Sequence, residues 1–314
     1  MDDIASLAEY AHRYNARVFM ALNTLFTNEE LPRARSLAFD AAKAGVDVLI
    51  VQDMGLMAGP LPDIELHAST QCDIRTPEKA AFLEKAGFSQ MVLARELSLE
   101  QIRFISQHAS IETEVFVHGA LCFCYSGQCY MSALIGRRSG NRGACAQPCR
   151  MQYSMGGRMD EYPLSLRDNC LADYLQQLAD AGVACVKIEG RMKRPEYVAV
   201  VTDVYARCIH EHRVPTQEEN DRLALAFSRQ GFTQGYLLGK KGPDMLGTRA
   251  AEPDRETEKM FTAARKAYAD GEGMENDLNV FFAQITPNKY LEERIFTSIV
   301  SKDELADAAS PELA

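Results

Sequence analysis

The sequence has no apolar run longer than a strand, so no segment is typical of a transmembrane helix. It also lacks the pattern of a signal peptide, because the opening MDDIASLAEYAHRYNA is acidic and then amphipathic. A formal net charge of -10 argues against a general nucleic-acid coat protein, which would be basic. We therefore expect a cytoplasmic protein without membrane contact.

Several catalytic and metal motifs are also missing. There is no HExxH or GxSxG motif, which are signatures of zinc peptidases and of many serine hydrolases. No CxxC pair occurs, whereas a zinc ribbon normally has two. With 314 residues, 46% of them hydrophobic, the chain can bury one large core or two modest ones.

Cysteine, by contrast, is plentiful, with nine residues in the chain. In a chain without an export signal, clustered thiols bind metal more often than they form disulfides. One cluster follows an apolar run and is spaced C-x6-C, then x15, then C-x3-C, which suits a loop folded around a metal or iron–sulfur centre. Its members are Cys122, Cys129, Cys145 and Cys149. Spacing alone does not separate zinc from iron–sulfur.

The other cysteines receive different interpretations. Cys124, two residues after Cys122, is interpreted as a core thiol, and Cys170 is a rival for the fourth ligand position. The remaining three lie in helical or strand patterns that are typical of buried packing residues, namely Cys72, Cys185 and Cys208.

Short apolar runs alternate with helical stretches along most of the chain. Six runs are predicted as strands: 17–23, 46–53, 64–69, 88–95, 111–118 and 184–189. Helices are predicted between them, for example over 31–44, 76–86 and 98–108, and glycines 45, 87 and 182 end helices just before a strand. Strands that are apolar on both faces and alternate with helices favour a parallel sheet covered by helices.

Polar residues collect where these predicted strands end. In a β/α barrel the active site lies at the carboxyl ends of the strands, because the following loops converge there. We therefore predict that six residues line a catalytic pocket, namely His67, Gln71, His118, Lys187, Glu189 and Arg191. A single such residue is also explained by a helix cap or a strand-end hydrogen bond.

Arginines gather in and after the cysteine-rich segment. Six occur between positions 137 and 167, with only Asp160 and Glu161 to balance them. A solvated loop explains such a run as well as a binding surface does. If the protein binds RNA, we expect Arg137, Arg138 and Arg142 to contact the backbone phosphates.

Three stretches, VFVHGALCFCYSGQCYMS, NRGACAQPCR and VKIEGRMKRPEYV, resemble the motifs of the collagenase-like U32 peptidase family. The resemblance extends from about position 5 to about position 249 and includes ELHASTQ, MVLARELS and FSRQGFTQGYLLGKKGPDMLG. Family members include bacterial enzymes that hydroxylate a cytidine of 23S rRNA or a wobble uridine of tRNA, and relatives serve oxygen-independent ubiquinone hydroxylation. Other members are called collagenases.

The resemblance implies a barrel-like fold, an iron–sulfur cluster of the 4Fe-4S type and, for the RNA branch, prephenate as an accessory metabolite. The first three ligand positions of the family match Cys122, Cys129 and Cys145. RNA-hydroxylating members have a further cysteine four residues later, which favours Cys149 over Cys170. rRNA or tRNA is then the expected partner, with an unidentified electron donor.

The chain also departs from the family, whose members begin with further strand units. The expected fold is therefore an α/β, incomplete TIM-like β/α barrel of about six parallel strands, with the cysteine-rich loop at its carboxyl face and a helical C-terminal part. We place a partial barrel at 1–192 with the insertion at 120–165, a helical extension at 193–250, and a helical or weakly ordered tail at 251–314. Open barrel edges would favour pairing between copies.

Three functions remain open at this point. The first is an oxygen-independent RNA hydroxylase that modifies a pyrimidine at its 5 position. The second is a peptidase, which would need a nucleophile with a base, such as Cys122 or Cys124 with His118. The third is a protein without catalytic activity whose cluster is structural.

Overall fold

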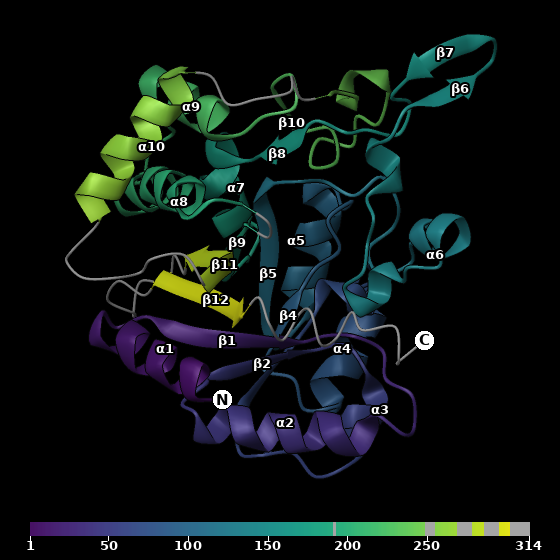
Figure 1. The fold of residues 1–314 in the computed structure, drawn as a ribbon, viewed down its shortest axis with the longest axis vertical. Helices are drawn as coiled ribbons and strands as arrows, with labels where there is room; N and C mark the ends of the chain where they lie inside the picture. The colour runs from purple at the N-terminus through teal and green to yellow at the C-terminus, as the bar shows by residue number, and fades with distance from the viewer. Residues whose placement is uncertain (191–192, 249–254, 269–277, 286–294, 302–314) are drawn as a thin grey trace.

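In the computed structural model of the protein, residues 1–190, 193–248, 255–268, 278–285 and 295–301 are described. The main sheet forms a ring in the order β1-β2-β3-β4-β5-β9-β11-β12, which closes because β12 pairs with β1 (Figure 1). Its strands are β1 (Arg17–Leu22), β2 (Val48–Val51), β3 (Glu65–Ala68), β4 (Gln90–Val92), β5 (Glu112–Gly119), β9 (Cys185–Glu189), β11 (Leu278–Ile285) and β12 (Ile295–Ser301).

The six strands predicted from the sequence are all present in this ring. They correspond to β1 to β5 and β9, and every pair of neighbours among them is parallel. Register is set by pairs such as Phe19 with Val48 and Ile50 with His67. The prediction of an α/β fold with a mostly parallel sheet is confirmed.

The gap between β9 and β1 is filled by two strands from the segment that the sequence suggests is a tail. β11 pairs antiparallel with both β9 and β12, and β12 runs parallel to β1. Both segments are rich in β-branched and aromatic residues, which suit strands. They give the edges of β1 and β9 the partners that an open barrel would lack.

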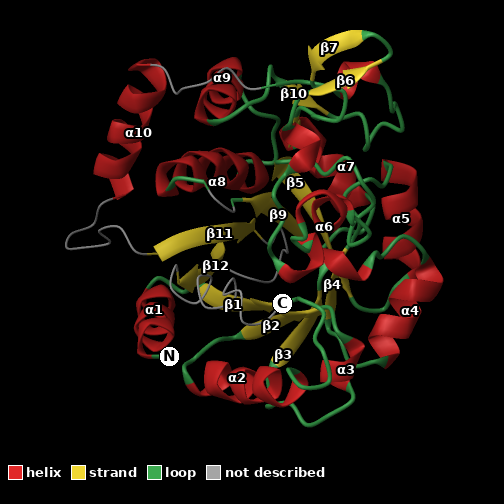
Figure 2. Cartoon of the chain, turned by 45° about the vertical axis from the view of Figure 1, so that its right-hand side comes forward, coloured by secondary structure: helices red, strands yellow, loops and turns green. Residues whose placement is uncertain are grey.

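Helices surround the ring on its outside (Figure 2). They are α1 (Asp2–Arg13), α2 (Leu31–Lys43), α3 (Met54–Met57), α4 (Pro77–Lys85), α5 (Leu99–His108), α6 (Met131–Gly136), α7 (Leu175–Asp180), α8 (Pro195–His210), α9 (Gln217–Ala226) and α10 (Arg255–Tyr268). The Ser98 side chain caps α5 in a capping box. Glycines follow the ends of α4 and α7 as predicted, with φ of 102° at Gly87 and 90° at Gly182.

Shorter elements cover the carboxyl end of the ring. Strands β8 (Asp168–Cys170) and β10 (Phe232–Thr233) extend the sheet beyond β5, while β6 (Tyr153–Met155) and β7 (Arg158–Glu161) form a hairpin that projects from the body (Figure 1). Short 3₁₀ turns are η1 (Thr70–Cys72), η2 (Gly140–Arg142), η3 (Pro148–Arg150), η4 (Ala172–Tyr174) and η5 (Pro243–Met245).

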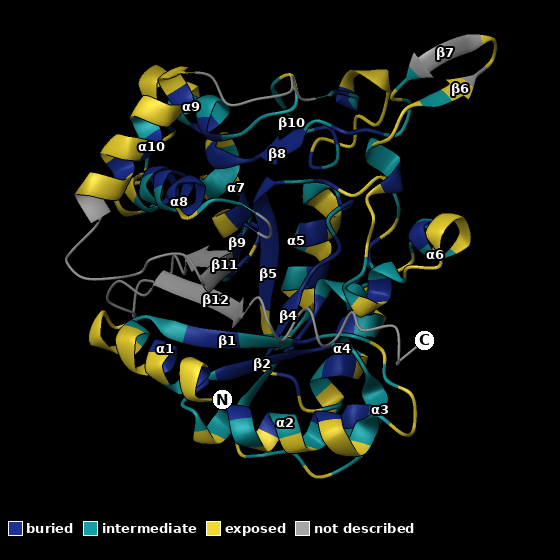
Figure 3. Cartoon of the chain, viewed as in Figure 1, coloured by how far each residue is buried: buried dark blue, intermediate teal, exposed yellow. Residues whose placement is uncertain are grey.

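The two faces of the strands bury different chemistry. Outward residues such as Leu49, Val115 and Ile188 join the large apolar core beneath the helices. Inside the ring, Phe19, Val48 and Ile50 form a small apolar cluster. Buried polar and charged side chains fill the rest of the interior of the ring. Figure 3 shows β5 buried over most of its length, whereas much of α6 is exposed. No helix in the described part of the chain is both long and apolar enough to cross a membrane.

Candidate cysteine centre at the carboxyl face of the barrel

The cysteine-rich loop leaves the carboxyl end of β5 and is held by residues that follow β4. Ser126 donates to the buried carboxylate of Glu96 twice, from its backbone N at 3.2 Å and from its hydroxyl at 2.9 Å. The Ser126 hydroxyl in turn accepts from the backbone N of Arg95 at 3.1 Å. Arg95 and Glu96, which follow β4, therefore position the cysteine-rich loop over the ring.

Arg150 joins the two halves of this loop. Its guanidinium donates to the carbonyl of Leu121 at 2.6 Å and to that of Leu166 at 2.5 Å. Tyr236 donates its hydroxyl to the carbonyl of Cys122 at 3.1 Å, from the late segment of the chain. Because Arg150 follows Cys149 and Leu121 precedes Cys122, these contacts hold the first and fourth predicted ligands in adjacent segments.

Three of the predicted ligand thiols act electrostatically on the fourth, Cys149. Burial raises the pKa of the Cys149 thiol, Arg150 opposes this, and the charges of Cys122, Cys145 and Cys129 raise it further. Such mutual influence requires that the thiols lie near one another. Cys122, Cys145 and Cys129 therefore lie within electrostatic range of Cys149.

Hydrogen-bond donors also point at two of these sulfur atoms. Cys145 Sγ accepts from the backbone N of Gln147 at 3.3 Å and from the hydroxyl of Ser132 at 3.7 Å. Cys122 Sγ accepts from Arg95 Nη1 at 3.7 Å. Donors of this kind stabilise a thiolate and tune the potential of any metal that it binds.

The other two candidate cysteines have different surroundings. The interpretation of Cys124 as a core thiol is wrong, because the side chain is only partly buried. Its thiol donates to the carbonyl of Gln128 at 3.6 Å and lies within electrostatic range of Cys129 and Cys122. Cys170 is buried against α8, with Sγ 3.7 Å from the hydroxyl of Tyr205, and burial is the main reason why its pKa is raised. Of the two rivals for the fourth position, Cys149 is the one that lies near the other thiols.

The four cysteine thiols can be compared with the two kinds of metal group that they would bind, a single ion or an iron–sulfur cluster. Within the described residues, no three histidine, cysteine or acidic side chains are grouped as a single metal ion would require. A four-iron cluster is larger than an ion, so its thiolate ligands stand farther apart. Thiolates are the ligand type that such a cluster uses, so the chemistry of these four side chains fits the predicted group.

Charged residues fill the ring beneath the loop. Glu114 Oε1 lies 3.0 Å from Lys187 Nζ, and Gln90 Nε2 donates to Glu114 Oε2 at 2.7 Å, with all three side chains almost completely buried. Buried charges are costly unless they are paired and hydrogen-bonded. An ionic group of this kind in a barrel that could have been filled by apolar residues favours a functional pocket.

Arg95 links this interior to the cysteine loop. Its guanidinium pairs with Glu189 at 2.6 Å and lies 3.9 Å from the ring centre of Phe116, in addition to its contact with Cys122. Lys187 and Glu189, both predicted as pocket residues, are thus brought together inside the ring. Arg191 lies outside the described residues.

The remaining predicted pocket residues are spread more widely. His67 is inside the ring but its Nε2 bonds Glu65 Oε1 at 2.8 Å, towards the amino end of β3, and this bond is the main reason why the pKa of Glu65 is lowered to about 2. Gln71 lies on η1 and lines a cavity of about 390 Å³ beside the cysteine loop. His67 and Gln71 therefore face opposite ends of the barrel.

His118 lies between the ring and α8. Its Nδ1 is 3.3 Å from the Tyr205 hydroxyl, and burial is the main reason why its pKa is lowered to about 3. In the described part of the chain, no hydrogen bond or charge interaction joins it to Cys122 or Cys124. The cysteine–histidine pair that a peptidase would need is therefore not formed there.

The three arginines that are predicted to bind phosphate differ in the contacts that they make within the protein. Arg142 donates to the carbonyl of Leu25 at 2.7 Å and pairs with Glu30, so it fastens the β1–α2 loop to the cysteine loop. Arg138 donates its Nε to the carbonyl of Ala144 at 3.1 Å. Arg137 is exposed in a left-handed conformation at the end of α6.

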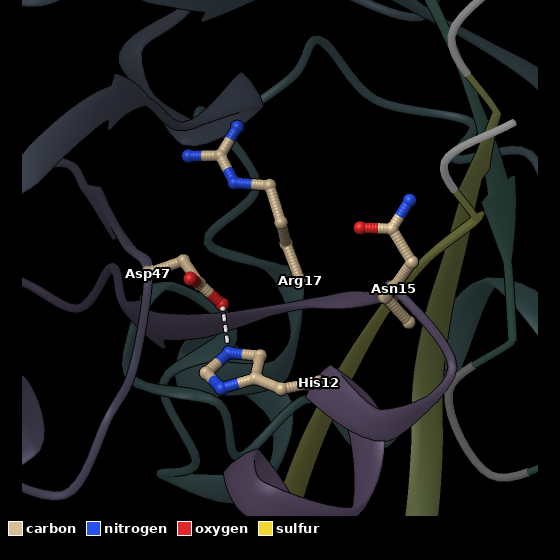
Figure 4. A pocket seen from close by; sticks show the side chains of 5 residues that line it. His12, Asn15, Arg17 and Asp47 are labelled. Atoms are coloured by element: carbon tan, nitrogen blue, oxygen red, sulfur yellow. Dashed lines mark hydrogen bonds and ion pairs between the residues drawn. The ribbon is translucent and has the colours of Figure 1, made fainter. Parts of the chain in front are cut away.

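A second cavity, of about 310 Å³, lies at the opposite end of the barrel (Figure 4). It is lined by residues around the start of β1 and of β2, where His12 Nε2 and Asp47 Oδ2 are 3.0 Å apart. The amino ends of barrel strands serve stability rather than catalysis. We assign the function to the cysteine face.

Sequence reasoning misses several residues of this site. Gln90 and Glu114 lie in strands that were predicted from their apolar neighbours. Their signal is the presence of polar residues at alternate positions of otherwise apolar strands, which marks the inner face of a barrel. Arg150 carries no such signal, because its partners are backbone carbonyls distant in sequence.

The fold and the site define a β/α barrel that carries four cysteines on a loop at its carboxyl face, above a charged interior. The model of peptidase family U32 matches residues 1–246, and the chain belongs to this family.

Curated relatives extend the comparison. The chain is 51% identical over 244 residues to the 23S rRNA 5-hydroxycytidine synthase of Escherichia coli K12, covering 76% of this chain and 36% of the relative. It is 33% identical to a tRNA hydroxylation protein of Bacillus subtilis, over 75% of this chain and 61% of the relative. A collagenase of Porphyromonas gingivalis W83 is also 33% identical, covering 76% of this chain and 64% of the relative. The chain thus spans about a third to two thirds of these relatives' lengths.

A solved U32 peptidase structure is similar with a TM-score of 0.32 and 21% identity, covering 37% of this chain and 51% of that one.

Proposed function

We propose that this chain carries the iron–sulfur barrel of an RNA hydroxylase that adds oxygen to a pyrimidine base of rRNA or tRNA without using molecular oxygen. The support for the choice of reaction is the similarity to proteins named for rRNA and tRNA hydroxylation. The proposal makes the chain an enzyme whose partner is RNA, and an unidentified reductant is also required.

The observation that carries the proposal is the gathered quartet of thiols. Cys122, Cys129, Cys145 and Cys149 come from two segments that Arg150 joins, and the charges of the other three thiols act on Cys149. Thiolates are the ligands that a four-iron cluster uses. When bound, such a cluster would supply single electrons at the carboxyl face of the barrel.

The chain's own residues would do the rest by binding and orientation. Arg95 lies between Cys122 and Glu189, so it is suited to orient groups that enter the ring from the cysteine side. Lys187 and Arg95 already hold the carboxylates of Glu114 and Glu189. If prephenate binds in the ring, its carboxylates would take the place of one of these internal partners.

Hydroxylated nucleosides provide the test of the reaction. Mass spectrometry of digested rRNA and tRNA from a strain lacking the gene should show the loss of one 5-hydroxypyrimidine, and a plasmid copy should restore it. An unchanged set of hydroxylated nucleosides would refute the RNA proposal.

Iron content provides the test of the centre, and Cys149 and Cys170 form a matched pair of variants. Anaerobically purified protein should contain iron and acid-labile sulfide and absorb broadly in the visible range. Cys149→Ser should lose most of both, because it removes a ligand, whereas Cys170→Ser should keep them. Equal losses, or zinc in place of iron, would contradict the ligand assignment.

Proteolysis is the second candidate, because a relative 33% identical is named collagenase. It predicts that the purified chain hydrolyses gelatin, whereas the RNA proposal predicts that it does not. The position of His118 against α8 favours the RNA proposal, since a thiol nucleophile needs a base within hydrogen-bonding reach.

A further inference from the structure

The cavity of about 390 Å³ beside the cysteine loop has an unusual lining. It lies between the carboxyl ends of β2 and β3, α4, and the segments around Cys129 and η2, so it belongs to the catalytic face of the barrel. Its polar lining residues are Gln52, Gln71, Lys79, Gln128, Tyr130 and Asn141. The volume falls in the range of small-molecule and nucleotide sites, which is about 300–1,000 Å³.

Carboxamides make up most of the polar part of this lining, with one ammonium group and with neither a carboxylate nor a guanidinium, and the rest is largely apolar. A side-chain amide offers two donors and one acceptor in a plane, which complements the edge of a nucleobase. A dicarboxylate metabolite would require more positive charge than Lys79 provides. The chemistry therefore suits a neutral, planar, polar ring.

Gln52 supplies the most specific feature. Its Nε2 donates to the carbonyl of Gln71 at 3.2 Å, which fixes the orientation of the amide. Its Oε1 is buried and has no hydrogen-bond partner. A buried acceptor without a donor costs free energy, and an exocyclic amino or ring N–H group of a base would satisfy it once the amide turned its oxygen into the cavity.

Tyr130 and Lys79 provide the other parts of a nucleotide site. The Tyr130 side chain lines the cavity and is 59% exposed, so one face of its ring is available to stack on a base. Lys79 is on α4, at another wall, where it can contact a phosphate.

The cavity is built by the docking of the cysteine loop. Gly127 has a φ of +74°, and a Cβ at this position would come within 2.1 Å of the carbonyl oxygen of Gln71. The loop backbone therefore touches η1 directly, and only glycine permits this approach. Gln128 and Tyr130 flank the predicted ligand Cys129, which connects the cavity to the centre.

The geometry points to this cavity as the binding site for one unpaired base of an RNA strand. The choice of RNA rests on the proposed function, whereas the cavity and its amide lining do not. An enzyme that modifies a base must take it out of the stack and hold it by its edge and its face. Gln52 would hold the edge and Tyr130 the face.

Binding of short RNA to the full chain tests the site. A hairpin RNA with one unpaired pyrimidine in its loop should bind more tightly than a fully paired duplex of the same composition. Gln52→Leu and Tyr130→Ala should each weaken binding of the hairpin by roughly tenfold or more, since base contacts and stacking each contribute about 1–3 kcal/mol. Gln128→Leu, at an exposed position of the lining, should weaken it as well.

The matched control is Gln176→Leu on α7. Gln176 is an exposed glutamine that donates to Asp180 and is distant in sequence from the residues of the cavity, so this substitution should leave RNA binding unchanged. A 4-thiouridine placed in the loop of the hairpin should cross-link to Tyr130 or Gln128 on irradiation. Cross-links confined to other segments, or unchanged affinity in Gln52→Leu and Gln128→Leu, would overturn the assignment. Tight binding of free prephenate that is lost in Gln52→Leu would also overturn it, in favour of a metabolite site.

This outcome is separable from that of the proposed reaction. If deletion of the gene changes no hydroxylated nucleoside but Gln52→Leu still weakens binding of the hairpin, the base site stands and the hydroxylase proposal fails. If deletion removes a 5-hydroxypyrimidine and a Gln52→Leu copy restores it fully with normal binding, the hydroxylase stands and the base site fails.

Discussion

His118 is buried among the rings of Tyr197, Tyr205 and Phe232, and its Nε2 has no hydrogen-bond partner. Burial lowers its pKa to about 3, with a smaller contribution from the charge of Lys193. The side chain is therefore neutral in the folded protein at neutral pH. In the unfolded chain it would take up a proton below its ordinary pKa of 6.5.

This difference makes folding stability depend on pH. Between pH 6.5 and pH 3 the unfolded chain binds a proton that the folded protein does not, so stability falls as the pH falls. Between pH 7 and pH 5, the free energy of unfolding should decrease by about 2 kcal/mol more in the wild type than in His118→Gln. Urea unfolding at the two pH values measures this. His210→Gln, at an exposed position of α8, should behave like the wild type, and equal slopes in all three proteins would contradict the prediction.

The position of His118 also shows where strand patterns mislead. Strict alternation would place Glu114, Phe116 and His118 on one face of β5, inside the ring. The register with β9 shifts between Phe116 and His118, so that His118 pairs with Ile188, whose side chain lies in the helix-facing core. A bulge of one residue reverses the face of every later side chain, and no local sequence signal announces it here.

The docking of the cysteine loop on η1 depends on a single close contact. Gly127→Ala would place a methyl group against the Gln71 carbonyl and strain a left-handed backbone, which together should cost at least about 2 kcal/mol. We expect the loop over 120–150 to become sensitive to proteases and its amides to exchange faster, while the helices around the ring keep their protection. Hydrogen exchange with mass spectrometry resolves the two regions.

Gly136→Ala is the matched control for this variant. Gly136 lies in the same loop, at the end of α6, and a Cβ there meets nothing within 4 Å. It should leave loop protection unchanged. Equal exchange in both variants would show that the contact between Gly127 and Gln71 does not hold the loop.

The elements of the barrel were more predictable than their contacts. Short apolar stretches such as 48–51 and 115–117 indicate strands, and the glycines that follow the helices fix the helix ends. Segments of two to four residues, such as β8 and β10, carry no period of their own, and their pairing is decided by tertiary contacts. The cysteine quartet was predicted from spacing and family resemblance, but its links through Arg150 and Gly127 depend on backbone positions that only the folded chain reveals.

The protein as a whole is acidic, with a net charge of -10, so binding to RNA must depend on few cations. Arg142 is paired with Glu30, so the candidate phosphate ligands are Lys79, which lines the proposed base site, and Arg137 and Arg138 on the cysteine-rich loop. Three contacts with single-stranded RNA predict that log K falls with log salt with a slope of roughly −2. Titrations of the hairpin at several salt concentrations measure the slope.

Replacing both Arg137 and Arg138 by Gln should bring the slope closer to zero by about 1. A slope steeper than roughly −4 in the wild type would instead require a larger basic surface than these residues form.

The contacts of Arg150, Ser126 and Gly127 fasten the cysteine-rich loop to the barrel. In zinc fingers, by comparison, the ion itself provides the free energy of folding. If the proposed cluster is bound, these protein contacts would still hold the loop after its oxidative loss, and the damaged protein should remain folded.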